Sequence, residues 1–203
     1  CTIQLGIGAM PNAVGYALKN KKDLGIHSEM VCDSMIDLIE CGVITGRKKT
    51  IHKERLVATF AMGSEKLYRY IAKHPMIEFY PVTYTNDPAL IAKNYKMIAI
   101  NATAEIDLGG QCASESIGTR QLSGVGGQMD FCRGAYRSEG GKSFLCLHST
   151  AKNGTISKIV ASLRPGTCVT TTRAEVHYIV TEYGVAMLKG KTMKQRAQEL
   201  IAI

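Results

Sequence analysis

The chain of 203 residues is long enough to form a sizeable hydrophobic core without disulfide or metal cross-links. Its 45% hydrophobic and 21% charged residues are those of an ordinary globular protein, which excludes the disordered, collagen-like and coiled-coil classes. No apolar run approaches the roughly 20 residues needed to span a bilayer, so we expect no association with a membrane.

The net charge of +8 is compatible with two interpretations. A basic protein can bind a polyanion, such as nucleic acid or a phosphate-bearing small molecule, or it can present solvated basic faces. The basic residues fall into three short clusters: Lys19, Lys21 and Lys22; Arg47, Lys48 and Lys49; and Lys189, Lys191, Lys194 and Arg196. They form no continuous stripe interleaved with aromatic residues, and Trp is absent. We therefore favour solvated faces and expect no nucleic-acid partner.

The seven cysteines are dispersed along the chain and contain no CxxC pair. A secreted disulfide framework or a zinc site would show a denser, even-numbered set or paired short spacings. Most of these thiols are therefore expected to be free and buried, in the reducing environment of the cytoplasm. The five histidines form no helical i, i+4 pair with an acid, so no metal site is expected.

The hydrophobic pattern of the first half alternates between strands and helices. Strands are expected over residues 1–7, 55–62, 77–82 and 96–101, with a further apolar run over residues 24–31. Helices are expected from Pro11 to about Asn20, from Asp33 or Ser34 to Gly42, and over residues 64–73 and 87–93. This alternation is typical of an α/β domain with a largely parallel sheet.

The second half contains more strands. A hairpin is expected over residues 105–115, turning at Gly109 and Gly110, and a helix over residues 129–137. Strands follow over residues 142–148, 157–163, 167–173 and 176–181, with a closing helix from Thr192. The fold class is therefore α/β, with an open, mostly parallel or mixed sheet flanked by helices.

No shift in composition divides the chain, so residues 1–203 are expected to form one domain. Residue 1 is a cysteine that leads directly into an apolar run. This beginning suggests a domain cut out of a longer protein.

Ligands of open α/β sheets gather at the carboxyl ends of the strands, on the loops that lead into helices. Glu29 occupies such a position, in a mostly apolar run with Ile26, Met30 and Val31. Burying its charge is costly, so the side chain either reaches solvent or pairs with a lysine, or it is held poorly solvated as a base or nucleophile. The pattern alone leaves both interpretations open.

A second candidate is the glycine-dense loop over residues 123–128, which precedes the expected helix. Consecutive backbone N–H groups in such a loop can cradle a phosphate or form an oxyanion hole, and only glycine permits close approach or positive φ. No Gly-Lys-Ser/Thr follows, and the full dinucleotide-binding spacing is absent. A plain tight turn is the alternative.

The third candidate is Glu182, a second acid at the end of an apolar strand. Two such acids suggest general acid–base catalysis by a pair of carboxyl groups, although the spacing does not establish that they are close. A structural role for Glu182 is the alternative. Cys146 and His148 lie two residues apart on an expected strand, so their side chains are expected to point the same way. They could mimic a thiol–imidazole pair, but we favour two side chains that point into the core.

Seven segments, in order along the chain, together resemble one known family: residues 5–14, 24–30, 84–88, 106–111, 123–131, 149–154 and 180–184. They include LGIGAMPNAV, LGIHSEM and VTEYG, and they resemble the C-terminal domain of the acetyl-CoA hydrolase/transferase family. The resemblance implies the CoA-transferase (NagB/RpiA-like) fold. It also implies transfer of CoA between a short-chain acyl-CoA and a carboxylate such as 4-hydroxybutyrate, butyrate or acetate. The alternative is hydrolysis of an acyl-CoA thioester such as acetyl-CoA.

The resemblance also implies roles for particular residues. The nucleophile of the family falls on Glu29, which would form a glutamyl-CoA thioester in a ping-pong cycle. The oxyanion-hole glycine falls on Gly126 or Gly127, and a second active-site acid on Glu182. Asn86, Gly124 and Gln128 are expected to contact CoA, which is a substrate, and no bound cofactor is required.

Members of the family have a further N-terminal domain, and the active site lies between the two domains. The resemblance therefore implies that the 203-residue chain lacks part of the pocket and that the missing domain completes it. A homo-oligomer is the family's expectation.

Overall fold

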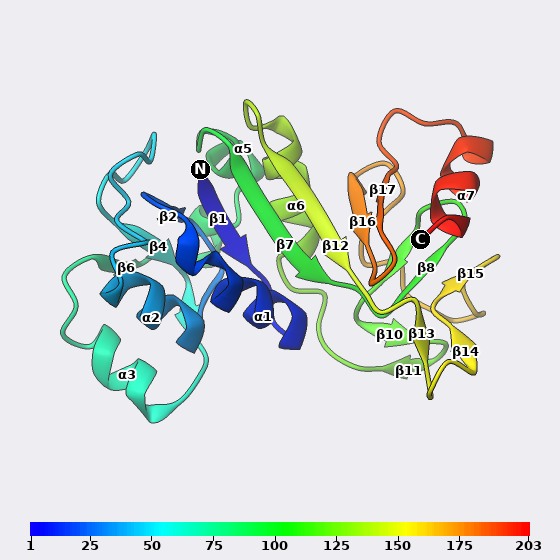
Figure 1. The fold of residues 1–203 in the computed structure, drawn as a ribbon, viewed down its shortest axis with the longest axis horizontal. Helices are drawn as coiled ribbons and strands as arrows, with labels where there is room; N and C mark the ends of the chain where they lie inside the picture. Colours follow the sequence, from blue (N-terminus) through cyan, green and yellow to red (C-terminus); the bar gives the residue numbers. More distant parts are fainter.

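A six-stranded sheet runs through the centre of the molecule (Figure 1), in the order β17-β16-β12-β7-β1-β2. The computed structural model describes the backbone of all 203 residues and every side chain except those of Ala9 and Asn12. The strands of the sheet are β1 (Thr2–Leu5), β2 (Gly25–Ile26), β7 (Met97–Ala102), β12 (Lys142–Cys146), β16 (Tyr178–Val180) and β17 (Val185–Met187). All neighbouring pairs are parallel except β16 and β17. The expected mostly parallel sheet is confirmed.

Helices cover both faces of this sheet. They are α1 (Ala9–Ala17), the 3₁₀ turn η1 (Leu18–Asn20), α2 (Asp33–Glu40), α3 (Glu65–Ile71), α4 (Val82–Thr85), α5 (Pro88–Ala92), α6 (Gln128–Arg137) and α7 (Met193–Ile201). Alternate residues of β7 face opposite sides, as the strand period requires. Ile98 and Ile100 pack on the core shared with α1 and α2, whereas Met97 and Ala99 pack against Phe131 of α6. The helix α7 lies at the opposite end of the molecule from α2 and α3 (Figure 1).

Further short strands form small sheets that are separate from the central one. β3 (Met30–Val31) pairs with β5 (Phe60–Ala61), and β4 (Leu56–Ala58) pairs with β6 (Ile77–Phe79), all in parallel. β8 (Glu105–Asp107) lies between β9 (Cys112–Ala113) and β15 (Ile159–Val160). Two hairpins join β10 (Ser116–Ile117) to β11 (Arg120–Gln121), and β13 (Thr150–Ala151) to β14 (Ile156–Ser157).

Most of the expected elements are present. The helix 129–137 corresponds to α6, the hairpin 105–115 to β8 and β9, and the closing helix to α7, which Thr192 caps through a capping box with Gln195. The turn of the hairpin requires positive φ at Gly110, where φ is 91°. The apolar run 24–31 and the expected strand 55–62 are each divided into two short strands, because residues near Glu29 and Thr59 leave the strand geometry.

The expected strand over residues 167–173 is wrong. Only an isolated bridge between Cys112 and Thr171 exists there, since the N–H groups of Thr170 and Thr171 both donate to the carbonyl of Cys112. The hydroxyl of Thr170 instead accepts hydrogen bonds from the N–H groups of Ser114 and Glu115. Side-chain bonds therefore replace the regular ladder in this segment.

All seven thiols are free, and four of them are buried: Cys32, Cys112, Cys132 and Cys146. Burial raises the pKa of Cys132 to about 12 and that of Cys146 to about 11, so neither is a reactive thiolate.

The inward orientation expected for His148 is wrong, because β12 ends at Cys146 and the His148 side chain is exposed. Within the described part of the chain, no helix has the length and apolarity that crossing a bilayer requires.

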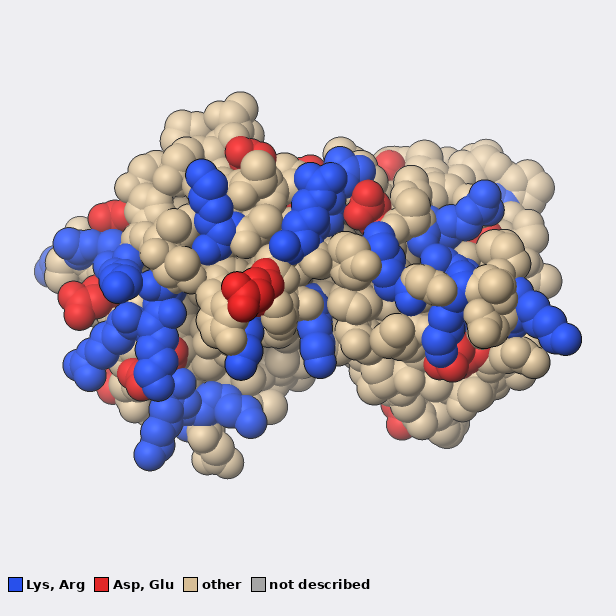
Figure 2. All heavy atoms as spheres, turned by 90° about the horizontal axis from the view of Figure 1, so that it is seen from above, with Lys and Arg blue, Asp and Glu red and all other residues tan. Residues whose placement is uncertain are grey.

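Basic side chains are spread over the face shown in Figure 2, in several groups with acidic and uncharged surface between them. Lys19, Lys21, Lys22 and Arg47 line one shallow hollow together with Asp23. Two clusters that are separate in the sequence therefore meet in space. Lys49, from the second cluster, is buried instead of exposed.

Candidate active site

Glu29 lies in the short connection between β2 and β3, near the carboxyl edge of the sheet. Its backbone carbonyl accepts hydrogen bonds from the N–H groups of both Thr59 and Phe60, at 2.9 and 3.1 Å. Two successive N–H groups thus point at one carbonyl, in the gap between the β3–β5 pair and the isolated bridge that joins His27 to Val57. The Glu29 side chain is half-buried, whereas its neighbours Ser28 and Met30 are buried.

Two N–H donors hold the Glu29 carboxylate. The amide nitrogen Nδ2 of Asn86 donates to Oε1 at 3.0 Å, and the backbone N–H of Gly127 donates to Oε2 at 3.2 Å. Asn86 is only 7% exposed and follows the last residue of α4, whereas Gly127 is the N-cap of α6. None of the ion pairs among the described side chains includes Glu29. The carboxylate is therefore bound by amides at the positive end of a helix dipole.

The glycine loop approaches Glu29 closely at one position. A Cβ atom at Gly127 would lie 2.9 Å from Oε2 of Glu29 and would also collide with the amide of Asn86. Gly126 has a φ of 59°, and a Cβ atom there, or at Gly124, would meet no atom within 4 Å. Of the two glycines left open by the sequence, Gly127 is the one whose N–H points at the carboxylate. Gly126 supplies the left-handed turn that places it.

A cavity of about 460 Å³ opens beside the carboxylate. Its lining is Gly6, Ile7, Glu29, Phe60, Asn101, Ala102, Ser114, Ser123, Gly124, Val125, Gly126, Gly127, Gln128 and Thr170. Glu29 is the one ionisable side chain in this lining, and the exposed side chains of Ile7, Phe60 and Val125 are apolar. The site can therefore present a single carboxylate to a ligand across a mainly apolar and amide surface.

Five of the residues expected in the site line this cavity: Glu29, Gly124, Gly126, Gly127 and Gln128. Asn86 joins them through its hydrogen bond to Glu29, and its buried Oδ1 has no partner among the described residues. The side-chain nitrogen of Gln128 donates to the carbonyl of Ala102 at 3.1 Å, so this amide holds the loop against the end of β7.

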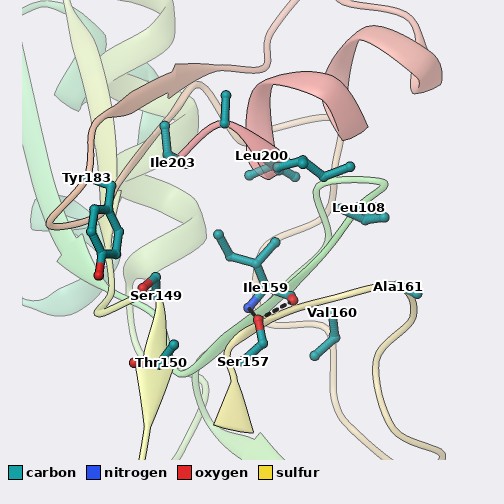
Figure 3. A pocket seen from close by; sticks show the side chains of 12 residues that line it. Leu108, Ser149, Thr150, Ser157, Ile159, Val160, Ala161, Tyr183, Leu200 and Ile203 are labelled. Carbon is teal, nitrogen blue, oxygen red and sulfur yellow. Dashed lines mark hydrogen bonds between the residues drawn. The ribbon is translucent and has the colours of Figure 1, made fainter. Parts of the chain in front are cut away.

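Glu182 lies elsewhere, in the connection that follows β16. Its carboxylate accepts hydrogen bonds from the backbone N–H and the hydroxyl of Ser149, both at 2.8 Å, and Nδ1 of His148 is 4.0 Å away. The hydrogen bonds from Ser149 hold the pKa of Glu182 below its ordinary value. Ser149 and Tyr183 line a second cavity of about 550 Å³, between the β13–β14 hairpin and the end of α7 (Figure 3). The two cavities share no lining residue, so this chain does not bring Glu182 and Glu29 into one pocket.

Two polar residues under the site escaped the sequence analysis. Asn101 lines the cavity and exchanges two amide hydrogen bonds with Gln4 on β1, at 2.9 and 3.0 Å. The sequence feature that could have revealed Asn101 is a polar residue at the end of an apolar strand. His27, two residues before Glu29, is completely buried and contacts the carbonyl of Thr85. Its signal was a titratable residue in an apolar run.

A lysine that contacts the end of β2 is also buried. Lys49 is 1% exposed, and its Nζ donates to the carbonyls of Ile26 and Arg55, at 2.9 and 2.8 Å. Desolvation lowers the pKa of Lys49 to about 8. The amine thus ties the end of β2 to the segment that precedes β4.

No group of three or more potential metal ligands occurs among the residues that the structure describes.

The site thus consists of one carboxylate that is bound by amides, beside a glycine loop at the edge of an open sheet. This arrangement is suited to acyl transfer. The sequence model of the acetyl-CoA hydrolase/transferase C-terminal domain matches residues 63–203. The chain belongs to this family, as the motifs predicted.

Similar proteins agree with this assignment. The chain is 54% identical over 202 residues to the 4-hydroxybutyrate coenzyme A transferase of Clostridium kluyveri, covering 100% of this chain and 47% of that protein. It is 53% identical to the succinyl-CoA:cyclohexane-1-carboxylate CoA transferase of Geobacter metallireducens, covering 99% and 46%. The crystal structure of RipA from Yersinia pestis superimposes with a TM-score of 0.95 at 46% identity, covering 100% of this chain and 46% of that one. The chain thus spans about half the length of the relatives that it matches.

Proposed function

We propose that this domain carries the nucleophile of a carboxylate CoA-transferase, and that the nucleophile is Glu29. The observation that carries the proposal is the carboxylate held by the Asn86 amide and the Gly127 N–H beside a mainly apolar cavity. The names of relatives at 53–54% identity support the reaction class. Short-chain acids such as 4-hydroxybutyrate, butyrate and acetate are the substrates we expect.

In the first step, one Glu29 oxygen attacks the thioester carbon of an acyl-CoA. A C–O bond forms and the C–S bond breaks, which gives an acyl–glutamyl anhydride and the CoA thiolate. A carboxylate in water is a weak nucleophile because hydration stabilises its charge. The half-buried position and the apolar rim of Ile7, Phe60 and Val125 reduce that hydration when the pocket is closed.

In the second step, the thiolate attacks Cδ of Glu29 and the first acid leaves as a carboxylate. The enzyme is left as a glutamyl-CoA thioester, which an incoming carboxylate resolves by the reverse sequence. Each Glu29 oxygen has its own N–H donor. Whichever oxygen bonds to the acyl carbon, the other keeps a donor that can stabilise its negative charge in the tetrahedral intermediate. Asn86 and Gly127 therefore serve as the oxyanion donors of this step.

The remaining expected residues have supporting roles in the proposal. Gly124 and Gln128 would contact CoA from the cavity wall, and Asn86 would contact it from beside Glu29. Glu182 would act on the substrate as a second acid from the other side of a larger pocket. That arrangement requires the further domain implied by the family, because the two cavities are separate in residues 1–203. The homo-oligomeric state and the cytoplasmic location are still predictions.

The test is a product analysis of the protein expressed from its complete reading frame. Butyryl-CoA is incubated with and without acetate, and CoA species are separated by chromatography. Transfer predicts acetyl-CoA and butyrate only when acetate is present, with little free CoA. Free CoA that accumulates at the same rate with or without acetate would instead establish a thioester hydrolase. Formation of neither product would contradict both activities.

A further inference from the structure

His27 is the residue that follows β2, and its imidazole is completely buried. Nε2 lies 2.8 Å from the carbonyl oxygen of Thr85. A carbonyl oxygen only accepts hydrogen bonds, so Nε2 carries the proton. Burial lowers the pKa of His27 to about 4, which leaves the ring neutral near pH 7. Nδ1 has no partner among the described residues.

The His27 contact closes a ring of four residues. His27 and Glu29 are two positions apart on one segment, and Thr85 and Asn86 are adjacent on another. The imidazole joins His27 to the Thr85 carbonyl, and the Asn86 amide joins the second segment back to the Glu29 carboxylate at 3.0 Å. Two parts of the chain that are 57 or 58 residues apart are therefore fastened at two points, one of which is the reactive carboxylate.

The segment that carries Asn86 is a single short helical turn that contacts other parts of the chain through side chains. The helix α4 has four residues, and the carbonyl of Thr85 is one of its C-terminal carbonyls without a helical partner. A second tether holds the same helix, because the hydroxyl of Tyr84 lies 2.7 Å from Nε2 of His52. The backbone of His27 is itself fixed, since its N–H donates to Ile3 and it bridges to Val57. His27 is thus held by backbone bonds to neighbouring strands, whereas α4 contacts other parts of the chain through His27 and His52.

We propose that His27 is a positioning residue that, by holding the Thr85 carbonyl, sets the Asn86 amide against the carboxylate of Glu29. This inference rests on the proposed role of Glu29 as nucleophile. His27 touches neither substrate nor the reacting atoms, and it acts through Asn86. Its alternative is a purely structural core histidine, whose loss would change stability without a specific effect on turnover.

The experiment is a double-mutant cycle in the protein expressed from its complete reading frame. His27→Phe keeps a ring of similar shape without the donor, whereas His27→Gln restores an N–H at similar reach. We expect H27F to lower kcat by about 10- to 100-fold with a much smaller change in KM, because a small misplacement of an oxyanion donor has effects of this size. H27Q should recover most of this loss.

The cycle asks whether His27 acts through Asn86. In an Asn86→Ala background, H27F should have little further effect on kcat, because the amide that it positions is already absent. Equal losses in both backgrounds, or a kcat of H27F equal to that of the wild type, would overturn the proposal. Should H27F fail to fold, His27→Asn, whose amide is too short to reach Thr85, takes its place in the cycle.

A matched control is His177→Phe. His177 is half-buried against Tyr136 and Tyr178, and burial lowers its pKa to about 4 as well. His177 is outside the Glu29 cavity, so its replacement should leave kcat unchanged.

The wild-type activity separates the two proposals. Failure of the wild type to transfer CoA would defeat the proposed function itself. Normal wild-type transfer combined with a fully active H27F would defeat only the role of His27.

Discussion

Glu29 and Glu182 occupy the same kind of position in the sequence, and their surroundings differ in the fold. Both acids follow an apolar strand at the carboxyl side of the sheet. Glu29 is held by one side-chain amide and one glycine N–H beside a cavity with no other ionisable lining residue. Glu182 is exposed and accepts two hydrogen bonds from Ser149, with His148 4.0 Å away.

The difference shows what distinguishes a candidate nucleophile from a merely well-bound acid. The hydrogen bonds to Glu182 stabilise its charged form, which is why its pKa is lowered, and water reaches the same oxygens. At Glu29, a helix N-terminus and a side-chain amide replace part of that water while the cavity leaves room for a thioester. In the proposed mechanism, these donors would stay in place when negative charge moves onto the tetrahedral intermediate.

The largest effect is expected from Glu29→Gln. This substitution keeps the shape of the side chain and removes the nucleophilic oxygen, so kcat for transfer should fall by at least about 10³-fold. Steady-state assays with butyryl-CoA and acetate measure it. Glu65→Gln is the control, because Glu65 is an exposed acid that pairs with Arg69 on its own helix. A Glu29→Gln enzyme that retains a tenth of the wild-type kcat would show that the nucleophile is another group.

The next effect is expected from Gly127→Ala. The added Cβ would lie 2.9 Å from Oε2 of Glu29 and displace the Asn86 amide, so kcat should fall by about 10²- to 10³-fold, the range for loss of an oxyanion donor. Gly109→Ala is the control, since its Cβ would meet mainly the flexible end of Met193. A Gly127→Ala enzyme as active as the control would separate the glycine loop from the chemistry.

A smaller effect is expected from Glu182→Gln. Because Glu182 does not line the Glu29 cavity, its loss should lower kcat by roughly 10-fold through altered substrate contacts, without preventing covalent labelling of Glu29. Rate measurements are paired with a labelling assay on the same preparation. If Glu182→Gln abolished labelling while Glu29→Gln preserved it, the roles of the two acids would be reversed.

The smallest effect on turnover is expected from Lys49→Met. This substitution should change the pH dependence of the free energy of unfolding. The pKa of Lys49 is about 8 in the folded protein and about 10.5 when exposed, so between these values only the unfolded chain binds the proton. The free energy of unfolding of the wild type should therefore rise with pH relative to the variant, by up to roughly 3 kcal/mol from pH 7 to pH 10.5. Denaturant titrations at several pH values measure the difference. Lys48→Met, at an exposed neighbour, is the control, and a difference that does not change with pH would contradict the buried position of Lys49.

Local patterns in the sequence predicted the elements that position the site. The apolar run before Glu29 and the glycine loop before α6 are both signals within a few residues, and both elements are present. The division of the run 24–31 could not be predicted in this way. It depends on hydrogen bonds from Thr59 and Phe60 to the carbonyl of Glu29, which arise only when β3 and β5 pair.

The two hydrogen-bond donors to the Glu29 carboxylate could not be identified from local sequence patterns. Asn86 was expected in the site only from the family resemblance, and the sequence left the choice of glycine undecided. Asn86 lies 57 residues from Glu29, and no local pattern relates the two; the choice between Gly126 and Gly127 required the distance to Oε2. The error at His148 has a simple cause. The alternation of side chains was extended beyond Cys146, where the strand ends and the chain turns toward Glu182.

The central claim, that Glu29 carries CoA, is tested most directly by trapping the thioester. The protein from the complete reading frame is incubated with butyryl-CoA and then with borohydride, which reduces a glutamyl thioester to an alcohol, and peptides are mapped by mass spectrometry. The account predicts that the peptide containing His27, Ser28 and Glu29 is modified at Glu29 and that the Glu29→Gln variant is not. Modification of another glutamate, or of none while acetyl-CoA is still formed, would contradict it.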